Sequence, residues 1–147
     1  MQNQVAKKLL DYAPLMPTDN YTFKVDPKDG GYDAIKYCWS ENGYEYEMRW
    51  HTATPNAPEG TPPNWRVDRH KPGFAGGRDP VTGKKLQGYP GIDEVLIWPS
   101  NGTPYYILEK DWKIARYAYG KGTATQAQLE ILKYGHYICK RQNARLG

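Results

Sequence analysis

The sequence predicts a single α+β domain with a short N-terminal helix, a mostly antiparallel twisted sheet built from hairpins, and C-terminal helices packed on that sheet. Segments of alternating polar and apolar residues, separated by Asn-Gly and Gly/Pro turns, fill the middle of the chain. Helical periodicity occurs only near the two ends. The 147 residues suit one domain, and no linker or repeat divides them. We therefore treat residues 1–147 as one unit.

The individual elements follow from local patterns taken in chain order. A short amphipathic helix is expected where apolar residues recur at helical spacing before Pro14. Strands are expected where alternation is bounded by turn residues, and helices where apolar residues return to three- and four-residue steps. The expected ranges are a helix at 3–12, strands at 21–25, 32–39, 44–50, 65–69, 92–98 and 105–108, and helices at 111–119 and from a cap at Thr123 or Thr125 onward.

One hairpin and one long loop stand out among these elements. Asn42-Gly43 carries the signal of a tight hairpin turn between two strands. Residues 71–91 are rich in glycine and proline, and we expect them to form a long loop without regular structure. A loop of that length in a compact domain is usually functional. Its lysines make it a candidate flexible clamp for a substrate.

Composition limits the classes of function. The net charge of +4 favours a polyanionic partner only weakly. Thirteen tyrosines and five tryptophans suit a half-solvated sheet, and they also suit base stacking. No stretch is long and apolar enough to span a bilayer, and the histidines and cysteines have no zinc-site spacing. A disulfide between Cys38 and Cys139 and two free thiols both remain open.

The densest group of chemically active side chains lies at the end of the predicted hairpin and just beyond it. Two of the three histidines and three arginines fall within 22 residues: Arg49, His51, Arg66, Arg69 and His70. Metal-free cleavage of RNA needs a base for the 2′-hydroxyl, cations for the phosphorane and an acid for the leaving oxygen. His51 lies on the polar face of its strand, beside Thr52. The alternative interpretation is a hairpin with ordinary surface charges.

Two further groups could carry chemistry. Asp93 opens one predicted strand and Glu109 ends the next, an arrangement that could hold a magnesium ion for a nuclease of the restriction-enzyme type. Ordinary charges at strand ends explain the same acids. His136 falls in phase with apolar residues of the last helix, which fits a helix-packing histidine as well as a catalytic one.

Two blocks of the sequence resemble C-terminal toxin domains of bacterial polymorphic toxin systems. The first block consists of Tyr46-Glu47-Met48-Arg49-Trp50-His51-Thr52, Thr54-Pro55, Ala57-Pro58, Gly60, Asn64-Trp65, Val67, Arg69 and Pro72-Gly73. The second consists of Trp112, Ala115, Gly122-Thr123-Ala124-Thr125, Gln128, Leu132 and Gly135-His136. Together they cover about two thirds of the chain in the order typical of the family. Residues 74–104, which include Asp93, are additional to the pattern.

The resemblance implies an antibacterial ribonuclease toxin that acts in interbacterial competition. Such a domain is secreted or delivered by a larger carrier, acts in the cytoplasm of the target cell, and is neutralised by a cognate immunity protein. His51, Thr52, Arg69 and His136 are the functional positions that the resemblance implies. We expect His51 to be base or acid, Arg69 and Arg49 to stabilise the phosphorane, Thr52 to orient the phosphate, and His136 to be the second proton carrier.

The remaining expectations concern the substrate and the alternatives. Arg66, His70, Lys84 and Lys85 are expected to hold the backbone of an RNA substrate, with tRNA among the candidates. The lead hypothesis needs no cofactor. A Mg²⁺-dependent DNase using Asp93 and Glu109, or a non-catalytic module that binds nucleic acid or a partner, are the alternatives. An immunity protein is disfavoured, because it would more naturally be acidic.

Overall fold

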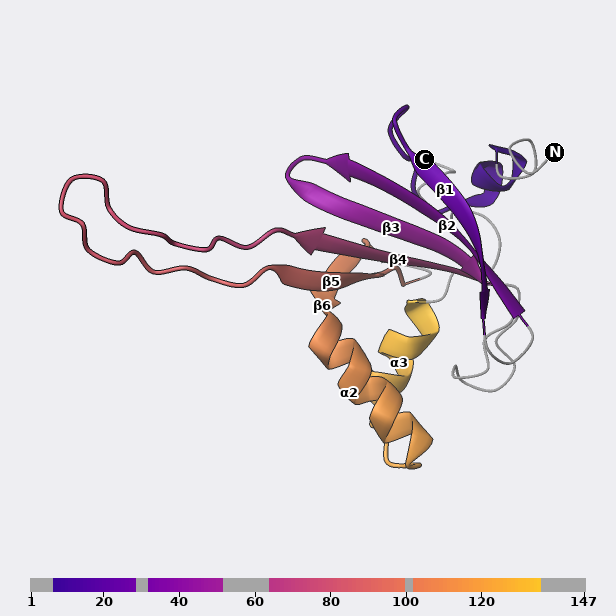
Figure 1. Ribbon diagram of the computed structural model, residues 1–147. Helices are drawn as coiled ribbons and strands as arrows, with labels where there is room; N and C mark the ends of the chain where they lie inside the picture. The colour runs from indigo at the N-terminus through magenta and orange to yellow at the C-terminus, as the bar shows by residue number, and fades with distance from the viewer. Residues whose placement is uncertain (1–6, 29–31, 52–63, 100–101, 136–147) are drawn as a thin grey trace.

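The computed structural model describes residues 7–28, 32–51, 64–99 and 102–135, and it confirms the α+β prediction (Figure 1). A short N-terminal helical segment, a six-stranded sheet and two C-terminal helices follow one another along the chain. The elements are η1 (Leu10–Tyr12), β1 (Thr22–Lys28), β2 (Tyr32–Glu41), β3 (Tyr44–His51), β4 (Asn64–Lys71), β5 (Ile92–Ile97), β6 (Tyr105–Leu108), α2 (Glu109–Gly120) and α3 (Gln126–Tyr134).

The sheet is an antiparallel meander in which each strand pairs with the next one along the chain, in the order β1-β2-β3-β4-β5-β6. The predicted hairpin joins β2 to β3. Asn42 and Gly43 both have positive φ, 53° and 83°, as a two-residue type I′ turn requires. This turn fixes the register, so Glu41 lies opposite Tyr44 and the polar alternation of β3 is set from its first residue.

The two faces of the sheet bury different cores. On one face, Tyr37, Met48, Trp65 and Val67 are fully buried, and Leu10 of the N-terminal segment packs in the same cluster. On the other face, Val95 and Ile97 of β5 pack against α2 and α3 through Trp112, Ala115 and Leu132. These helices contact mainly β5 and β6. We call the part of this second face formed by β2, β3 and β4 the open face.

Several element boundaries differ from the predictions. The N-terminal helix is described only from residue 7 and tightens into a 3₁₀ turn at Leu10–Tyr12, ending before Pro14. Glu109 was expected at the end of a strand, but it is the first residue of α2. Of the two candidate caps for α3, Thr125 is the one used, and it forms a capping box with Gln128.

The predicted long loop at 71–91 connects β4 to β5, and beyond Lys71 it contains no regular strand, but isolated bridges pair its two limbs. These residues form a two-stranded arm that projects from the ends of β4 and β5 (Figure 1), and we call residues 72–91 the arm. Phe74 and Tyr89 exchange two backbone hydrogen bonds of 2.7 Å. A Cβ on Gly88 would lie 2.6 Å from a carbonyl oxygen of the opposite strand, so glycine permits the close pairing. Gly83 takes a φ of 71° in the turn at the tip.

Candidate functional site

The strand register arranges the side chains of the open face in rows that run across the strands. Side chains two residues apart on one strand point to the same face, so alternate cross-strand pairs share a surface. From the arm toward the other end, the rows are Ser40, Glu45, His70 and Asp93; Cys38, Glu47 and Asp68; Lys36, Arg49 and Arg66; and Ala34, His51 and Asn64.

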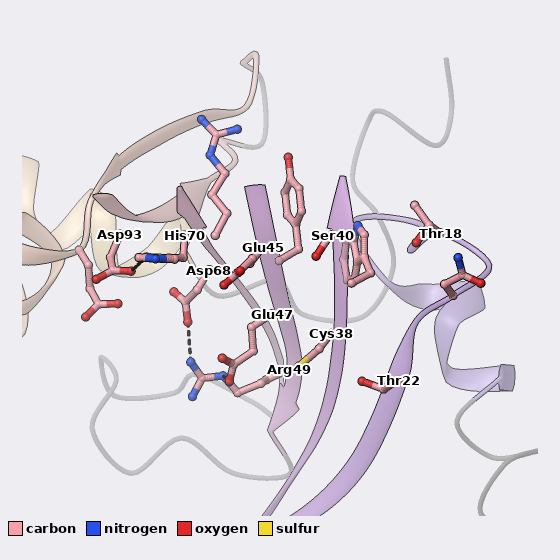
Figure 2. Close-up of a pocket in the computed structure, with 15 residues that line it drawn as sticks. Thr18, Thr22, Cys38, Ser40, Glu45, Glu47, Arg49, Asp68, His70 and Asp93 are labelled. Atoms are coloured by element: carbon pink, nitrogen blue, oxygen red, sulfur yellow. Dashed lines mark hydrogen bonds and ion pairs between the residues drawn. The ribbon is translucent and has the colours of Figure 1, made fainter. Parts of the chain in front are cut away.

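Side chains of the rows nearest the arm line a groove of about 750 Å³ (Figure 2). Its polar lining comes from three neighbouring strands and from the start of α2: Glu45, Glu47, Arg49, Asp68, His70, Asp93 and Glu109. The groove is therefore where titratable groups from distant parts of the sequence come together. We take it as the candidate functional site.

His70 and Asp93 form a hydrogen-bonded pair in the row nearest the arm. The distance from Nδ1 of His70 to Oδ1 of Asp93 is 2.7 Å, and the side chains are 39% and 57% exposed. The Asp93 carboxylate accepts a hydrogen bond from the Nδ1–H, so Nε2 is the nitrogen that accepts or releases a proton. Gly91 lies under the ring, since a Cβ there would be 2.8 Å from Nε2. The imidazole is thus oriented and solvent-accessible.

Glu45 lies directly across from His70 on β3. Opposite side chains on one face of an antiparallel pair have Cβ atoms roughly 5 Å apart. Glu45 is exposed, and among the described residues no cation pairs with its carboxylate. The row therefore places a carboxylate, an imidazole and an orienting carboxylate side by side. This is an arrangement for general acid and base catalysis.

The other carboxylates of the groove are already neutralised by neighbouring cations. Arg49 donates a hydrogen bond to Asp68 at 2.5 Å, and its Nε lies 3.1 Å from a carboxylate oxygen of Glu47. Lys36 also lies 3.3 Å from Glu47. The dashed line between Asp68 and Arg49 in Figure 2 marks the shorter of the Arg49 contacts. Arg49, predicted as a catalytic cation, therefore lines the groove but is held by two carboxylates.

Arg66 is held by contacts within the protein, with Asp68 on its own strand and with Trp112 of α2. Arg66 pairs with Asp68 at 3.1 Å, and its guanidinium lies 5.0 Å from the centre of the Trp112 ring, beneath α2. Burial lowers the pKa of Arg66, and the charge of Asp68 partly opposes that effect. Both contacts favour a role in attaching α2 to the sheet over the predicted contact with substrate.

Arg69 borders the groove, but it points to the opposite face of the sheet from His70, because the two are adjacent on one strand. Its guanidinium lies 4.0 Å from the centre of the Tyr44 ring and 3.5 Å from that of Tyr106, and it pairs with Glu94 at 2.8 Å. These contacts immobilise Arg69 on the core side. The predicted grouping of Arg69 with His51 is therefore not formed.

His51 lies at the far end of the open face from His70. It pairs across the strands with Asn64, six residues before His70 on β4, which corresponds to roughly 20 Å along the strand. His51 does not line the groove. Thr52 and His136, the other two predicted catalytic positions, lie outside the described residues.

The acids of the magnesium alternative line the same groove. Asp93 and Glu109 both line the groove, although Asp93 is paired with His70 and Glu109 lies 2.9 Å from Lys113. Within the described part of the chain, no group of three His, Cys, Asp or Glu side chains is close enough to hold a metal ion. The two acids alone would supply two ligands, with water or substrate completing a magnesium shell.

Cys38 is a further groove residue that the sequence did not indicate. Its thiol is free, and burial raises its pKa, an effect that the charge of Glu47 increases. Such a thiol stays protonated at neutral pH, which argues against a nucleophilic role. Glu45 was also missed. The hairpin register could have placed it on the face of His51, but its position opposite His70 depends on the pairing of β3 with β4.

Comparison with known protein families, characterised proteins and solved structures finds no significant match. Within the described residues, no helix is long and apolar enough to cross a membrane. The geometry of the groove is therefore the basis on which a function is assigned.

Proposed function

We propose that this chain is a ribonuclease domain that cleaves RNA by metal-independent general acid and base catalysis, with His70 at its centre. The observation that carries the proposal is the row formed by Glu45, His70 and Asp93 in a solvent-open groove. The sequence alone favoured His51 for this role. His70 replaces it because His70 lines the groove, whereas His51 does not, and because His70 contacts Asp93 and lies across from Glu45.

The chemistry needs one proton removed and one delivered. The Glu45 carboxylate takes the proton of a 2′-hydroxyl, and the resulting oxygen attacks the adjacent phosphorus. The bond from phosphorus to the 5′-oxygen breaks as protonated His70 gives its Nε2 proton to that oxygen. The products are a 2′,3′-cyclic phosphate and a free 5′-hydroxyl. Asp93 stabilises the imidazolium before transfer by accepting the hydrogen bond from Nδ1, which leaves Nε2 to donate the proton.

The charge of the groove is compatible with a phosphate. Glu47 and Asp68 are paired with Arg49, and Asp93 is paired with His70, so Glu45 is the carboxylate whose charge is least compensated. Arg49 is the guanidinium on the open face that lines the groove. We assign it the contact with the phosphate oxygens, where a fixed cation stabilises the charge that develops in the transition state.

The sequence resemblance supports the biological setting of this activity. We propose that the domain is a polymorphic toxin delivered into a target cell by a larger carrier, where it cleaves RNA, with tRNA among the candidates. A cognate immunity protein that covers the groove would neutralise it. An acidic surface on that partner would complement the excess of basic over acidic residues in this chain.

A Mg²⁺-dependent DNase is the second candidate, and one observation favours it. Asp93 and Glu109, the two acids that the sequence suggested as ligands, both line the groove. Bound magnesium would activate water and offset the phosphate charge. In this alternative, Asp93 would have to exchange its His70 partner for the ion.

The first test is cleavage of tRNA, total RNA and plasmid DNA by the purified chain, with and without EDTA. Loss of RNA that persists in EDTA supports the proposal. Loss of DNA that EDTA abolishes supports the magnesium candidate. An intact RNA pool at every protein concentration tested would contradict the proposed ribonuclease.

A pair of matched variants tests the assignment of the histidine. His70→Gln should lower kcat/KM for RNA by about 10²- to 10⁴-fold, the usual contribution of a general acid or base. His51→Gln removes the same group from the other end of the same face. Retention of activity in His70→Gln together with its loss in His51→Gln would show that the catalytic centre lies near His51 instead. Circular dichroism of both variants controls for folding.

A further inference from the structure

The arm holds a defined shape through backbone pairing that continues the ladder of β4 and β5. The last ladder pair is Lys71 with Ile92. The reciprocal hydrogen bonds of Phe74 and Tyr89 follow in the same register, and the Leu86 amide then donates to the Gly77 carbonyl at 2.9 Å. The bridges of the arm therefore keep the same strand register as the pairing of β4 with β5. A side chain on the arm therefore keeps a fixed relation to the groove.

Three kinds of pair follow one another along this ladder at four-residue intervals. His70 and Asp93 form the proposed acid–base pair, Phe74 and Tyr89 form an aromatic pair, and the next pair is Arg78 with Lys85. Even spacing favours the same side of a strand for His70 and Phe74, whereas Gly76 and Gly77, both with positive φ, interrupt the alternation before Arg78. The rings of the aromatic pair are 48% and 55% exposed, with centroids 6.0 Å apart.

The arm carries more basic than acidic residues. The segment 71–91 carries Lys71, Arg78, Lys84 and Lys85. Its single acid, Asp79, accepts hydrogen bonds from the turn amides of Val81 and Thr82 at 2.7 and 3.2 Å. The carboxylate is therefore used in shaping the tip. Cations and exposed aromatic rings together are the features with which proteins hold single-stranded nucleic acid.

We propose that the arm binds single-stranded RNA and leads it into the groove, an inference that rests on the proposed ribonuclease function. An unpaired base stacks on the rings of Phe74 and Tyr89, and Arg78 and Lys85 contact the phosphates nearer the tip. The strand then reaches His70 four residues below the aromatic pair. The substrate class is thus unpaired RNA rather than a duplex, whose stacked bases cannot reach the rings.

The probe is a fluorescein-labelled 2′-O-methyl oligonucleotide of mixed sequence, whose binding is followed by anisotropy. It lacks the nucleophilic 2′-hydroxyl, so affinity is measured without cleavage. Phe74→Ala/Tyr89→Ala should weaken binding about tenfold and leave its salt dependence unchanged. Arg78→Gln/Lys85→Gln should weaken binding and also flatten the slope of log K against log salt by about 1.4.

The matched control is Lys7→Gln/Lys8→Gln, which removes the same charge from exposed positions on the N-terminal segment and should change affinity less than threefold. Equal binding by the wild type and both arm variants would overturn the inference, as would preference for a duplex of the same sequence. Arm-dependent binding without RNA cleavage would support the arm and refute the proposed function. Cleavage of RNA together with binding that does not depend on the arm would support the proposed function and refute the role of the arm.

Discussion

At the scale of single residues, Gly91 decides where the imidazole of His70 can lie. The ring occupies the space that a side chain at position 91 would need, and the Lys71 carbonyl oxygen lies 2.8 Å from the same point. The imidazole is therefore confined between a backbone without a side chain and the carboxylate of Asp93. Glycine is needed here for close approach.

Replacing Gly91 by alanine should displace the His70 ring and break its 2.7 Å bond to Asp93. Because an unoriented imidazole is a poorer proton donor, we expect kcat/KM for RNA to fall at least about tenfold. Gly120→Ala is the matched control, since a Cβ at that position meets no atom within 4 Å. Equal cleavage rates for these two alanine variants would remove Gly91 from the positioning of His70.

The sequence analysis grouped His51 with Arg69, whereas the structure brings His70 together with Asp93. His51 was favoured because it stands beside Thr52 and close to Arg49 in the chain. His70 and Asp93 are separated by 23 positions in the sequence. The chain turns back at the tip of the arm, so that β5 pairs with β4 and places the two residues opposite each other. Only the pairing of β4 with β5 reveals that contact. Local sequence fixes which face a side chain occupies, but not which residue of the next strand lies opposite.

At the scale of elements, the two C-terminal helices attach to the sheet through a few buried contacts. Trp112 is fully buried in the second core, and a Cβ on Gly135 would overlap its ring. The Trp98 amide also donates to the carbonyl oxygen of Tyr134 at 2.9 Å, which connects α3 to the residue after β5. The start of α3 is held separately, by the capping box of Thr125.

Thr125→Ala should destabilise the domain by about 1 kcal/mol, because the amide of Gln128 loses its side-chain acceptor. Urea denaturation followed by tryptophan fluorescence measures this difference. Thr103→Ala, at an exposed position before β6, serves as the control and should lie within about 0.5 kcal/mol of the wild type. A shift no larger than that of the control would show that the cap contributes nothing.

Elements with local signals were predictable, and the arm was not. The turn at Asn42-Gly43 specified its hairpin completely, because both residues tolerate positive φ. The pairing of the two limbs of the arm was not predicted, because its composition, rich in glycine and proline, is that of irregular chain. The missed signal was Asp79-Pro80 followed by Gly83, a turn sequence at the centre of the segment.

At the scale of the whole molecule, the core that contains Tyr37 and Tyr106 makes folding stability depend on pH in the alkaline range. Tyr37 is fully buried, and burial raises the pKa of its phenol; burial and the neighbouring Tyr46 do the same for Tyr106. In the unfolded chain these phenols ionise near pH 10. The contribution of these two phenols to the free energy of unfolding is therefore fully present below about pH 10 and is lost as the pH rises above that value.

The urea midpoint should accordingly be flat from pH 8 to about 9.5 and then fall. Each tyrosine contributes at most about 1.4 kcal/mol per pH unit to that fall. Tyr37→Phe/Tyr106→Phe should make the fall shallower, because the variant has no phenol at these positions that ionises in the unfolded chain and stays protonated in the native state. The exposed Tyr105→Phe is the control. A double variant that loses stability as steeply as this control would assign the alkaline transition to other groups.

The meander has a consequence for how the chain reaches its native state. Since every strand joins the one preceding it, assembly requires closing only the segments between consecutive strands. Rates of folding rise as contacting residues lie nearer in sequence. A sheet with this connectivity is suited to assembly strand by strand, in which each strand adds to the edge formed by the one before it.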